Sequence, residues 1–428
     1  MADMAPFRAW KYDFSRVGPP SEVLAPPYDV ISHGRARELA KASPHHVIHL
    51  ILGKPAPGAS FGPGDYQRAA ETWDAWRRDG VLVRDEQPSL YVYDIEFSDL
   101  ITDERTTRTG VIGALKLEPF EAGVVLPHEE IFQGPLSDRI NLMRAADAVF
   151  SPIFGLHEDP GGAATAALAA KADEAFIETS DGDGCVHRVR RVTDAEAIEG
   201  FCAALAARTV IIADGHHRYT AALEHARAKG RLGGKADGSR TMFCLTPSDD
   251  PGLRAYGTHR LFRGLGGAPD LAPLADLARI QPLPDLDAAA AIQVVESAPA
   301  KLPTYVFATR GGLHRVSVED PSRLERLLVG VHPALRADEL TILHRALLTA
   351  LGIGASGIDV AGGVGHTRDA AEALREVRQG EADLAVLVRS PGGAELAAVC
   401  AAGQRMPQKT TYFYPKLLSG CVFLDLSG

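Results

Sequence analysis

The most informative hydrophobic pattern of the chain lies in residues 209–223, which read TVIIADGHHRYTAAL. Residues 209–213 form a continuous, largely β-branched apolar run, which is typical of a strand buried on both faces. Apolar residues then recur at helical spacing until Gly230 ends the pattern. The sequence therefore predicts a strand, a tight polar turn at residues 214–218 and a helix that starts within this turn.

Other segments carry strand patterns as well. Residues 90–97 and 110–117 are two apolar runs around a charged turn, which indicates an antiparallel hairpin. Residues 45–50, HHVIHL, and the segment after Lys409 alternate in polarity, and each predicts a further strand. Strand, helix and strand alternate from residue 209 to residue 247, so we expect the α/β class, with a mixed α+β sheet.

A change in composition divides the chain. Residues 264–284 are rich in Gly, Pro and Ala, as domain boundaries often are. The 428 residues are also many for a single hydrophobic core. We therefore expect an N-terminal domain of residues 1–263 and a C-terminal α/β domain of residues 286–428.

The charge balance excludes some classes of partner. With 45 basic and 55 acidic residues the formal net charge is −10, which argues against nucleic acid and anionic membranes and favours small molecules. The N-terminus lacks an apolar signal region, and no run of 18 uncharged apolar residues occurs. The five cysteines are scattered without a C-x-x-C pair, so neither a zinc site nor a disulfide framework is indicated. We expect a cytoplasmic protein.

The polar turn at residues 214–218 (the DGHHR turn) is the first candidate site. Free backbone N–H groups and the positive end of the helix dipole meet at a helix N-terminus, and Arg218 adds a full charge. The turn is therefore suited to a phosphate, with Gly215, His216 and His217 around it. In the alternative, structural interpretation, Asp214 caps the helix, Gly215 supplies the turn and the histidines lie on the surface.

A second candidate is the segment VVLPHEEIFQGP, in which His128, Glu129 and Glu130 stand between a proline and a glycine-proline pair. Its apolar flanks predict that at least one carboxylate is partly desolvated, which suits it to general-base work or metal ligation. A solvated acidic turn is the alternative.

Near the C-terminus the segment MPQKTTYFYPKLLSG carries Lys409 and Lys416. Lys409 stands before Thr410 and Thr411, so it offers one charge and two hydroxyl donors in a short span. We expect Lys409 to bind phosphate if this strand packs beside the DGHHR turn. The alternative is a solubilising charge at a sheet edge.

Four motifs carry a resemblance over nearly the whole chain: APPYDVIS, LPHEEIF, ADGHHRYTAAL and PQKTTYFYPKLLSG. Their order and separations resemble the bacterial and archaeal family catalogued as domain of unknown function 1015. The DGHHR turn is also similar to the G-x-x-R phosphate-binding turn of the ParB and sulfiredoxin superfamily, which includes free serine kinases. This resemblance implies a ParB/sulfiredoxin-like nucleotide-binding core with a second α/β domain. It places residues 215–218 around the donor phosphates and Asp214 where it helps to position magnesium or the acceptor.

These observations predict a nucleotide-dependent small-molecule kinase that uses ATP or ADP with Mg²⁺ and phosphorylates an amino acid such as free serine. A possible homodimer stays open. The predicted catalytic residues are His128, Glu129, Glu130 and Asp214; the predicted phosphate-binding residues are Gly215, His216, His217, Arg218 and Lys409; and the predicted metal ligands are Asp214 and Glu129. Two other classes remain. A metal-dependent phosphatase or hydrolase would use His128, Glu129, Asp214 and His216 as ligands, and a nucleotide-gated regulatory protein would use the same turn without turnover.

Overall fold

The computed structural model describes residues 1–52, 63–130, 133–234, 237–299, 301–353, 364–407 and 409–427. The chain forms two compact units. Unit 1 comprises Met1–Pro127, Ile131–Arg254 and Pro415–Gly428, and unit 2 comprises His128–Glu130 and Ala255–Tyr414. This division differs from the predicted domains, because the last segment of the chain belongs to unit 1 and the HEE residues belong to unit 2.

The sheet of unit 1 has nine strands and is mixed, in agreement with the predicted class. Strand β11 (Val210–Asp214) is parallel to β6 (Val125–Pro127) and antiparallel to β8 (Ile153–His157). Beyond β8 the order is β12 (Arg240–Pro247), β5 (Arg105–Lys116), β4 (Leu90–Ser98), β10 (Val186–Val192) and β9 (Ala175–Ser180), with β1 (Met4–Ala5) paired to β5. Strands β4 and β5 pair antiparallel, so the predicted hairpin is confirmed.

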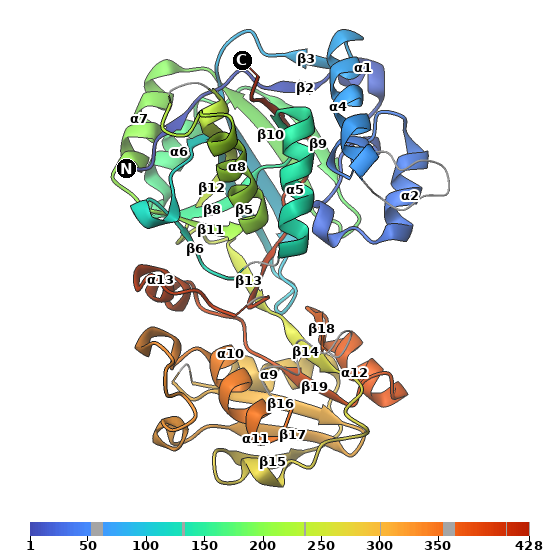
Figure 1. Cartoon of the computed structure of the whole chain (residues 1–428), viewed down its shortest axis with the longest axis vertical. Helices are drawn as coiled ribbons and strands as arrows, with labels where there is room; N and C mark the ends of the chain where they lie inside the picture. Colours follow the sequence, from blue (N-terminus) through green and yellow to red (C-terminus); the bar gives the residue numbers. More distant parts are fainter. Residues whose placement is uncertain are drawn as a thin grey trace. The chain divides into compact units, whose positions relative to one another are not determined.

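Two helices lie side by side on one face of this sheet, α5 (Gln133–Ala146) and α8 (His216–Ala228) (Figure 1). The predicted helix after the DGHHR turn is α8, and its buried residues include Tyr219, Leu223 and Ala226. The other helices of unit 1 are α1 (Phe14–Val17), α2 (His33–Ala42), α3 (Ile48–Ile51), α4 (Pro63–Arg78), α6 (Ala163–Ala169) and α7 (Ala195–Ala206). Two short strand pairs complete the unit: β2 (Trp10–Tyr12) with β3 (Leu82–Arg84), and β7 (Ala148–Val149) with β21 (Leu424–Asp425).

The prediction of a strand at residues 45–50 is wrong, because this segment leads into helix α3. The ring nitrogen Nδ1 of His46 accepts a hydrogen bond from the backbone N–H of Ile48 at 3.1 Å, at the start of the helix. All four residues of α3, a histidine among them, are buried. The alternation of polar and apolar residues therefore does not report one exposed and one buried face.

Unit 2 is built on a six-stranded antiparallel sheet. Its order is β15 (Arg279–Leu283), β17 (Gly312–Ser317), β16 (Thr304–Thr309), β19 (Leu384–Leu387), β14 (His259–Phe262) and β18 (Val364–Thr367). Successive residues of a strand point to opposite faces, and each face has its own core. Tyr305 and Phe307 pack with residues of α10 (Glu339–Ile342), whereas Val306 and Ala308 pack with α9 (Ala288–Glu296) and α12 (Ala370–Gln379).

The strand predicted near the C-terminus is confirmed as β20 (Thr411–Tyr414), which pairs with β13 (Arg254–Gly257). The chain passes into unit 2 within β13 and leaves it directly after β20. Over the described residues, the helices are too short or too polar to cross a membrane.

Candidate functional site

The DGHHR turn has the predicted strand–turn–helix structure. Strand β11 ends at Asp214, and α8 begins at His216. Between them Gly215 adopts the left-handed conformation, with φ of +98°. A Cβ atom at this position would lie 2.9 Å from the guanidinium of Arg218, so the turn needs a glycine for its backbone and for its space.

Three charged side chains meet at this turn. The carboxylate of Asp214 accepts a hydrogen bond from Arg218 Nη2 at 2.6 Å through Oδ2 and from Lys416 Nζ at 2.9 Å through Oδ1. Arg218 Nη1 also donates to the carbonyl of Pro152. The side chains of Asp214, Arg218 and Lys416 are 18%, 11% and 13% exposed, so the cluster is largely screened from water.

The electrostatics of this cluster are dominated by its cations. Burial of Asp214 opposes its ionisation, but the charges of Lys416 and Arg218 hold the pKa of its carboxyl well below the usual range. The carboxylate is therefore ionised at neutral pH, and one positive charge remains in excess at the start of α8. The helix dipole adds to that positive potential.

Lys416 is held in place by buried groups around the C-terminal segment. Arg108, which is almost wholly buried, donates from Nη2 to the carbonyl of Pro415 at 2.7 Å. The backbone N–H of Leu418 donates to the hydroxyl of Tyr93 at 3.1 Å. These contacts fix the chain on both sides of Lys416, so its ammonium group is positioned by the fold of unit 1.

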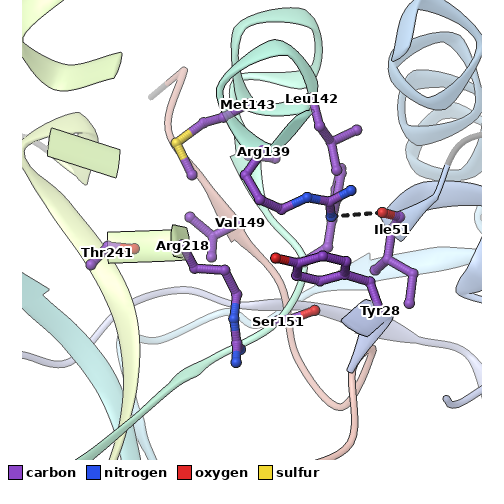
Figure 2. A pocket seen from close by; sticks show the side chains of 11 residues that line it. Tyr28, Ile51, Arg139, Leu142, Met143, Val149, Ser151, Arg218 and Thr241 are labelled. Carbon is purple, nitrogen blue, oxygen red and sulfur yellow. Dashed lines mark hydrogen bonds between the residues drawn. The ribbon is translucent and has the colours of Figure 1, made fainter. Parts of the chain in front are cut away.

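A small pocket lies beside Arg218, and Figure 2 shows its lining. Its polar side chains are Tyr28, Arg139, Ser151, Arg218 and Thr241. The cavity volume is about 40 Å³, which holds roughly three or four water molecules at 10–15 Å³ each. Its polar lining and small volume suit a small charged group such as a phosphate.

Two features of the pocket favour a polar ligand. The hydroxyl of Thr241 is buried and has no hydrogen-bond partner within the described residues. Arg139 donates to the carbonyl of Ile51 at 2.7 Å and places its guanidinium 3.9 Å from the ring centre of Tyr28. Burial raises the pKa of Tyr28 to about 12, so its hydroxyl is a neutral donor at physiological pH. The pocket thus combines two guanidinium groups, those of Arg139 and Arg218, with neutral hydroxyls, and Arg139 also forms an ion pair with Asp138.

The HEE residues lie in unit 2, against the segment that precedes β20. His128 is buried, and its Nε2 lies 2.8 Å from Oγ1 of Thr411. Glu129 is partly buried, with 22% of its side chain exposed, and its Oε2 accepts a hydrogen bond from the backbone N–H of Lys409 at 3.2 Å. Glu130 is exposed. The expectation of one partly desolvated carboxylate is therefore met by Glu129.

The hydroxyls of the two threonines after Lys409 were expected to serve as donors to a phosphate. Thr410 donates its hydroxyl to the carbonyl of Pro407 at 2.5 Å, and Thr411 is bonded to His128. Both hydroxyls have internal partners, so the expectation of two hydroxyl donors for phosphate is not met.

The predicted residues fall into two groups. Unit 1 holds residues 214–218, and unit 2 holds residues 128–130 together with Lys409. The ligand set predicted for a metal-dependent phosphatase is likewise divided, with two residues in each unit. Among the residues that the structure describes, no group of three or more His, Cys, Asp or Glu could hold a metal ion. Both oxygens of Asp214 accept hydrogen bonds from cationic side chains, so a magnesium ion would have to compete with Arg218 and Lys416 for this carboxylate.

Sequence reasoning missed Lys416 and Tyr28 as site residues. Lys416 and Tyr28 stand inside two of the four motifs, PQKTTYFYPKLLSG and APPYDVIS, so membership in those motifs was a usable signal. For Arg139 the sequence allowed contact with a phosphate or pairing with nearby acids, the commoner role of a helical arginine. Arg139 forms an ion pair with Asp138 and also lines the pocket.

Comparisons with known proteins agree with the family resemblance. The profile of the family described as "Protein of unknown function (DUF1015)" matches residues 4–335. No curated protein matches the chain. A solved conserved hypothetical protein from Pyrococcus furiosus is 13% identical, with 74% of this chain and 95% of that chain covered and a TM-score of 0.35.

Two further solved structures are similarly distant. One is described as free serine kinase in complex with AMP, at 11% identity, with 71% of this chain and 86% of that chain covered and a TM-score of 0.33. The other is SbnI with C-terminal truncation from Staphylococcus aureus, at 11% identity, with 72% and 85% covered and a TM-score of 0.35. Likeness at this level carries no functional conclusion, so the reaction has to be inferred from the residues of this chain.

Proposed function

We propose that this chain, which belongs to the family of unknown function DUF1015, is a nucleotide-dependent small-molecule kinase. The donor phosphates bind at the DGHHR turn of unit 1, and the acceptor is a small hydroxyl compound, with free serine the first candidate. The G-x-x-R likeness of the turn supports a ParB/sulfiredoxin-like core for unit 1. ATP and ADP are both candidate donors.

One observation carries the proposal: Asp214, Arg218 and Lys416 converge at the N-terminus of α8. Phosphoryl transfer spreads negative charge over the oxygens of the moving group, and catalysis depends mainly on neutralising that charge and on positioning. Two cations in a largely buried cluster, with one carboxylate between them, supply such an environment. Asp214 acts here as the group that holds both cations, in addition to its predicted role toward the acceptor or magnesium.

The small pocket supports a phosphate-sized group as its occupant. Thr241 offers a buried hydroxyl without a partner among the described residues. Arg139, which forms an ion pair with Asp138, lines the pocket from the neighbouring helix α5. The nucleoside part of a donor would extend out of this small, open pocket.

Three carboxylates are candidates for the general base. Glu129 and Glu130 remain predictions for this role. In unit 1 the exposed Asp29 follows Tyr28 of the pocket directly, in the 3-10 turn Tyr28–Val30, so Asp29 is a third candidate. Each acts, in this proposal, by accepting the proton of the acceptor hydroxyl.

Mass spectrometry of the products tests the proposal. The protein is incubated with ATP or ADP, magnesium and a panel of amino acids and small alcohols, and phosphorylated products are identified. A phosphorylated hydroxyl compound that is absent with the Lys416→Met variant supports the proposal. Nucleotide binding without any product would favour the regulatory alternative, and release of inorganic phosphate from phosphate esters would favour a phosphatase.

A further inference from the structure

A chain of hydrogen-bonded side chains in unit 1 leads to the segment that carries Lys416. Asp181 lies in the turn between β9 and β10, His187 lies on β10 and Tyr93 lies on β4. Asp181 Oδ2 is 3.1 Å from His187 Nε2, and His187 Nδ1 is 2.8 Å from the hydroxyl oxygen of Tyr93. That hydroxyl also accepts the hydrogen bond of the Leu418 N–H, two residues after Lys416.

The chemistry of these groups gives the chain one direction. Because a backbone N–H can only donate, the Tyr93 oxygen is the acceptor toward Leu418, and the tyrosine proton points to His187 Nδ1. Nδ1 is then the acceptor of a neutral imidazole, whose proton lies on Nε2 and faces Asp181. The carboxylate of Asp181 is therefore the last acceptor of the chain.

Burial protects this chain from water. His187 and Tyr93 are almost wholly buried, and 20% of the Asp181 side chain is exposed. Burial raises the pKa of Tyr93 well above its ordinary value, so the hydroxyl keeps the proton that it donates. Burial opposes the ionisation of Asp181, but hydrogen bonds, first that from His187, hold the pKa of its carboxyl below its usual value. Each link therefore has the protonation state that the next link requires.

The segment around Lys416 depends on side chains of the sheet. Pro415 has no N–H, and its carbonyl is bound by Arg108 of β5. The N–H of Leu418 is bound by Tyr93 of β4, and the backbone pairing with Ala25 begins only at Ser419. Lys416 thus stands between two anchors that are buried side chains, and the loss of one anchor should move it.

We infer that Tyr93, His187 and Asp181 are positioning residues for the proposed phosphoryl transfer. They hold the backbone at Leu418 and so keep the ammonium group of Lys416 against Asp214, where the two groups are 2.9 Å apart. This inference rests on the proposed function, because Lys416 is the residue through which the three side chains act.

Two substitutions break the chain with little change of shape. Tyr93→Phe keeps the ring and removes the acceptor of the Leu418 N–H, and His187→Leu removes the acceptor of the tyrosine proton. Tyr91→Phe is the matched control, because Tyr91 is a buried tyrosine of the same strand whose hydroxyl donates to Asp85 at 2.7 Å. Thermal melting and circular dichroism establish that each variant is folded.

The first readout is the acylation rate of Lys416 in the full-length protein without substrate, measured by mass spectrometry. In the wild type Lys416 should react slowly, because its ammonium is paired with Asp214 and its side chain is 13% exposed. Its rate, relative to the exposed Lys171 of unit 1, should rise several-fold in Tyr93→Phe and His187→Leu and stay unchanged in Tyr91→Phe. An unchanged rate in folded Tyr93→Phe or His187→Leu, or an equal rise in Tyr91→Phe, would overturn the inference.

The second readout is turnover in the product assay. A displacement of about 1 Å can lower a rate on the order of a hundredfold, so Tyr93→Phe should turn over about ten- to a hundredfold more slowly than the wild type. Tyr91→Phe should keep the wild-type rate, and wild-type turnover in Tyr93→Phe would also overturn the inference. If the wild type forms no phosphorylated product, the proposed function fails, while the acylation rates still decide whether the chain holds Lys416.

Discussion

Removal of the carboxylate at position 214 should destabilise the protein, because Asp214→Asn leaves Arg218 and Lys416 close together without their shared counter-charge. Loss of one member of a buried ion pair costs roughly 3–5 kcal/mol, and hydrogen bonds to charged groups contribute roughly 1.5–3 kcal/mol each. Because 18% of the Asp214 side chain is exposed, water can solvate part of the unpaired charge and reduce the loss of stability. We expect the free energy of unfolding to fall by about 2–4 kcal/mol at pH 7.

The effect has a defined pH dependence. Because the folded-state pKa of Asp214 is depressed, its stabilisation is fully present above the unfolded-state value of about 3.9. It is lost as the pH falls through the folded-state pKa. The difference between wild type and Asp214→Asn should therefore be constant from about pH 8 to pH 5 and should narrow below about pH 4.

Urea unfolding followed by circular dichroism at several pH values measures this difference. Asp74→Asn is the control, because Asp74 forms an ion pair with Arg77 while 63% of its side chain is exposed. The control should change the free energy of unfolding by no more than about 0.5 kcal/mol. A similarly small change in Asp214→Asn, or a difference that stays constant down to pH 3, would refute the assignment of both cations to this carboxylate.

Three further predictions concern the same turn and pocket. Gly215→Ala should lower the free energy of unfolding by about 1–2 kcal/mol, because alanine disfavours the left-handed backbone, and it should displace Arg218. Both the urea midpoint and the nucleotide affinity should therefore fall. Unchanged values would argue against a constrained turn. Lys416→Met keeps the aliphatic stem but not the charge, so turnover in the product assay should fall roughly ten- to a thousandfold. Wild-type turnover would show that Lys416 does not act in the reaction. Thr241→Val replaces a buried hydroxyl that lacks a partner among the described residues. The free energy of unfolding should stay the same or rise, while phosphate binding measured by calorimetry should weaken. Loss of stability with unchanged phosphate binding would show a structural role instead.

The strand–turn–helix at residues 210–228 could be predicted from the sequence because every signal there is local. A β-branched run, a glycine and a helical repeat each determine the structure within a few residues. The hairpin of β4 and β5 and the strand β20 were predictable for the same reason.

The composition of the candidate site was not predictable in the same way, because Lys416 reaches Asp214 across 202 positions of sequence. The local pattern favoured Lys409 as the phosphate-binding lysine, because two hydroxyl residues follow it. The lysine that contacts the DGHHR turn is Lys416, seven positions later. The chain moves from unit 2 to unit 1 between these two lysines, after Tyr414. Neither periodicity nor composition marks that transition, so both lysines were predicted to lie in one C-terminal domain.

The prediction of a strand at HHVIHL, residues 45–50, was wrong for a different physical reason. Alternating polarity predicts a strand when polar residues face water, but His46 and His49 are both buried. A buried histidine can bond to backbone groups, as His46 does through Nδ1 to the N–H of Ile48. Alternating polarity then says nothing about exposure.

Nucleotide binding by Arg218→Lys tests the central claim most directly. Lysine keeps the charge at the start of α8 but cannot reproduce the planar fork of the guanidinium. Arg227→Lys on the exposed end of the same helix is the matched control. Titration calorimetry with ATP and ADP should show an affinity about ten- to a hundredfold weaker for Arg218→Lys, and wild-type affinity for the control. Wild-type affinity in a folded Arg218→Lys protein would contradict the claim that the DGHHR turn binds the donor phosphates.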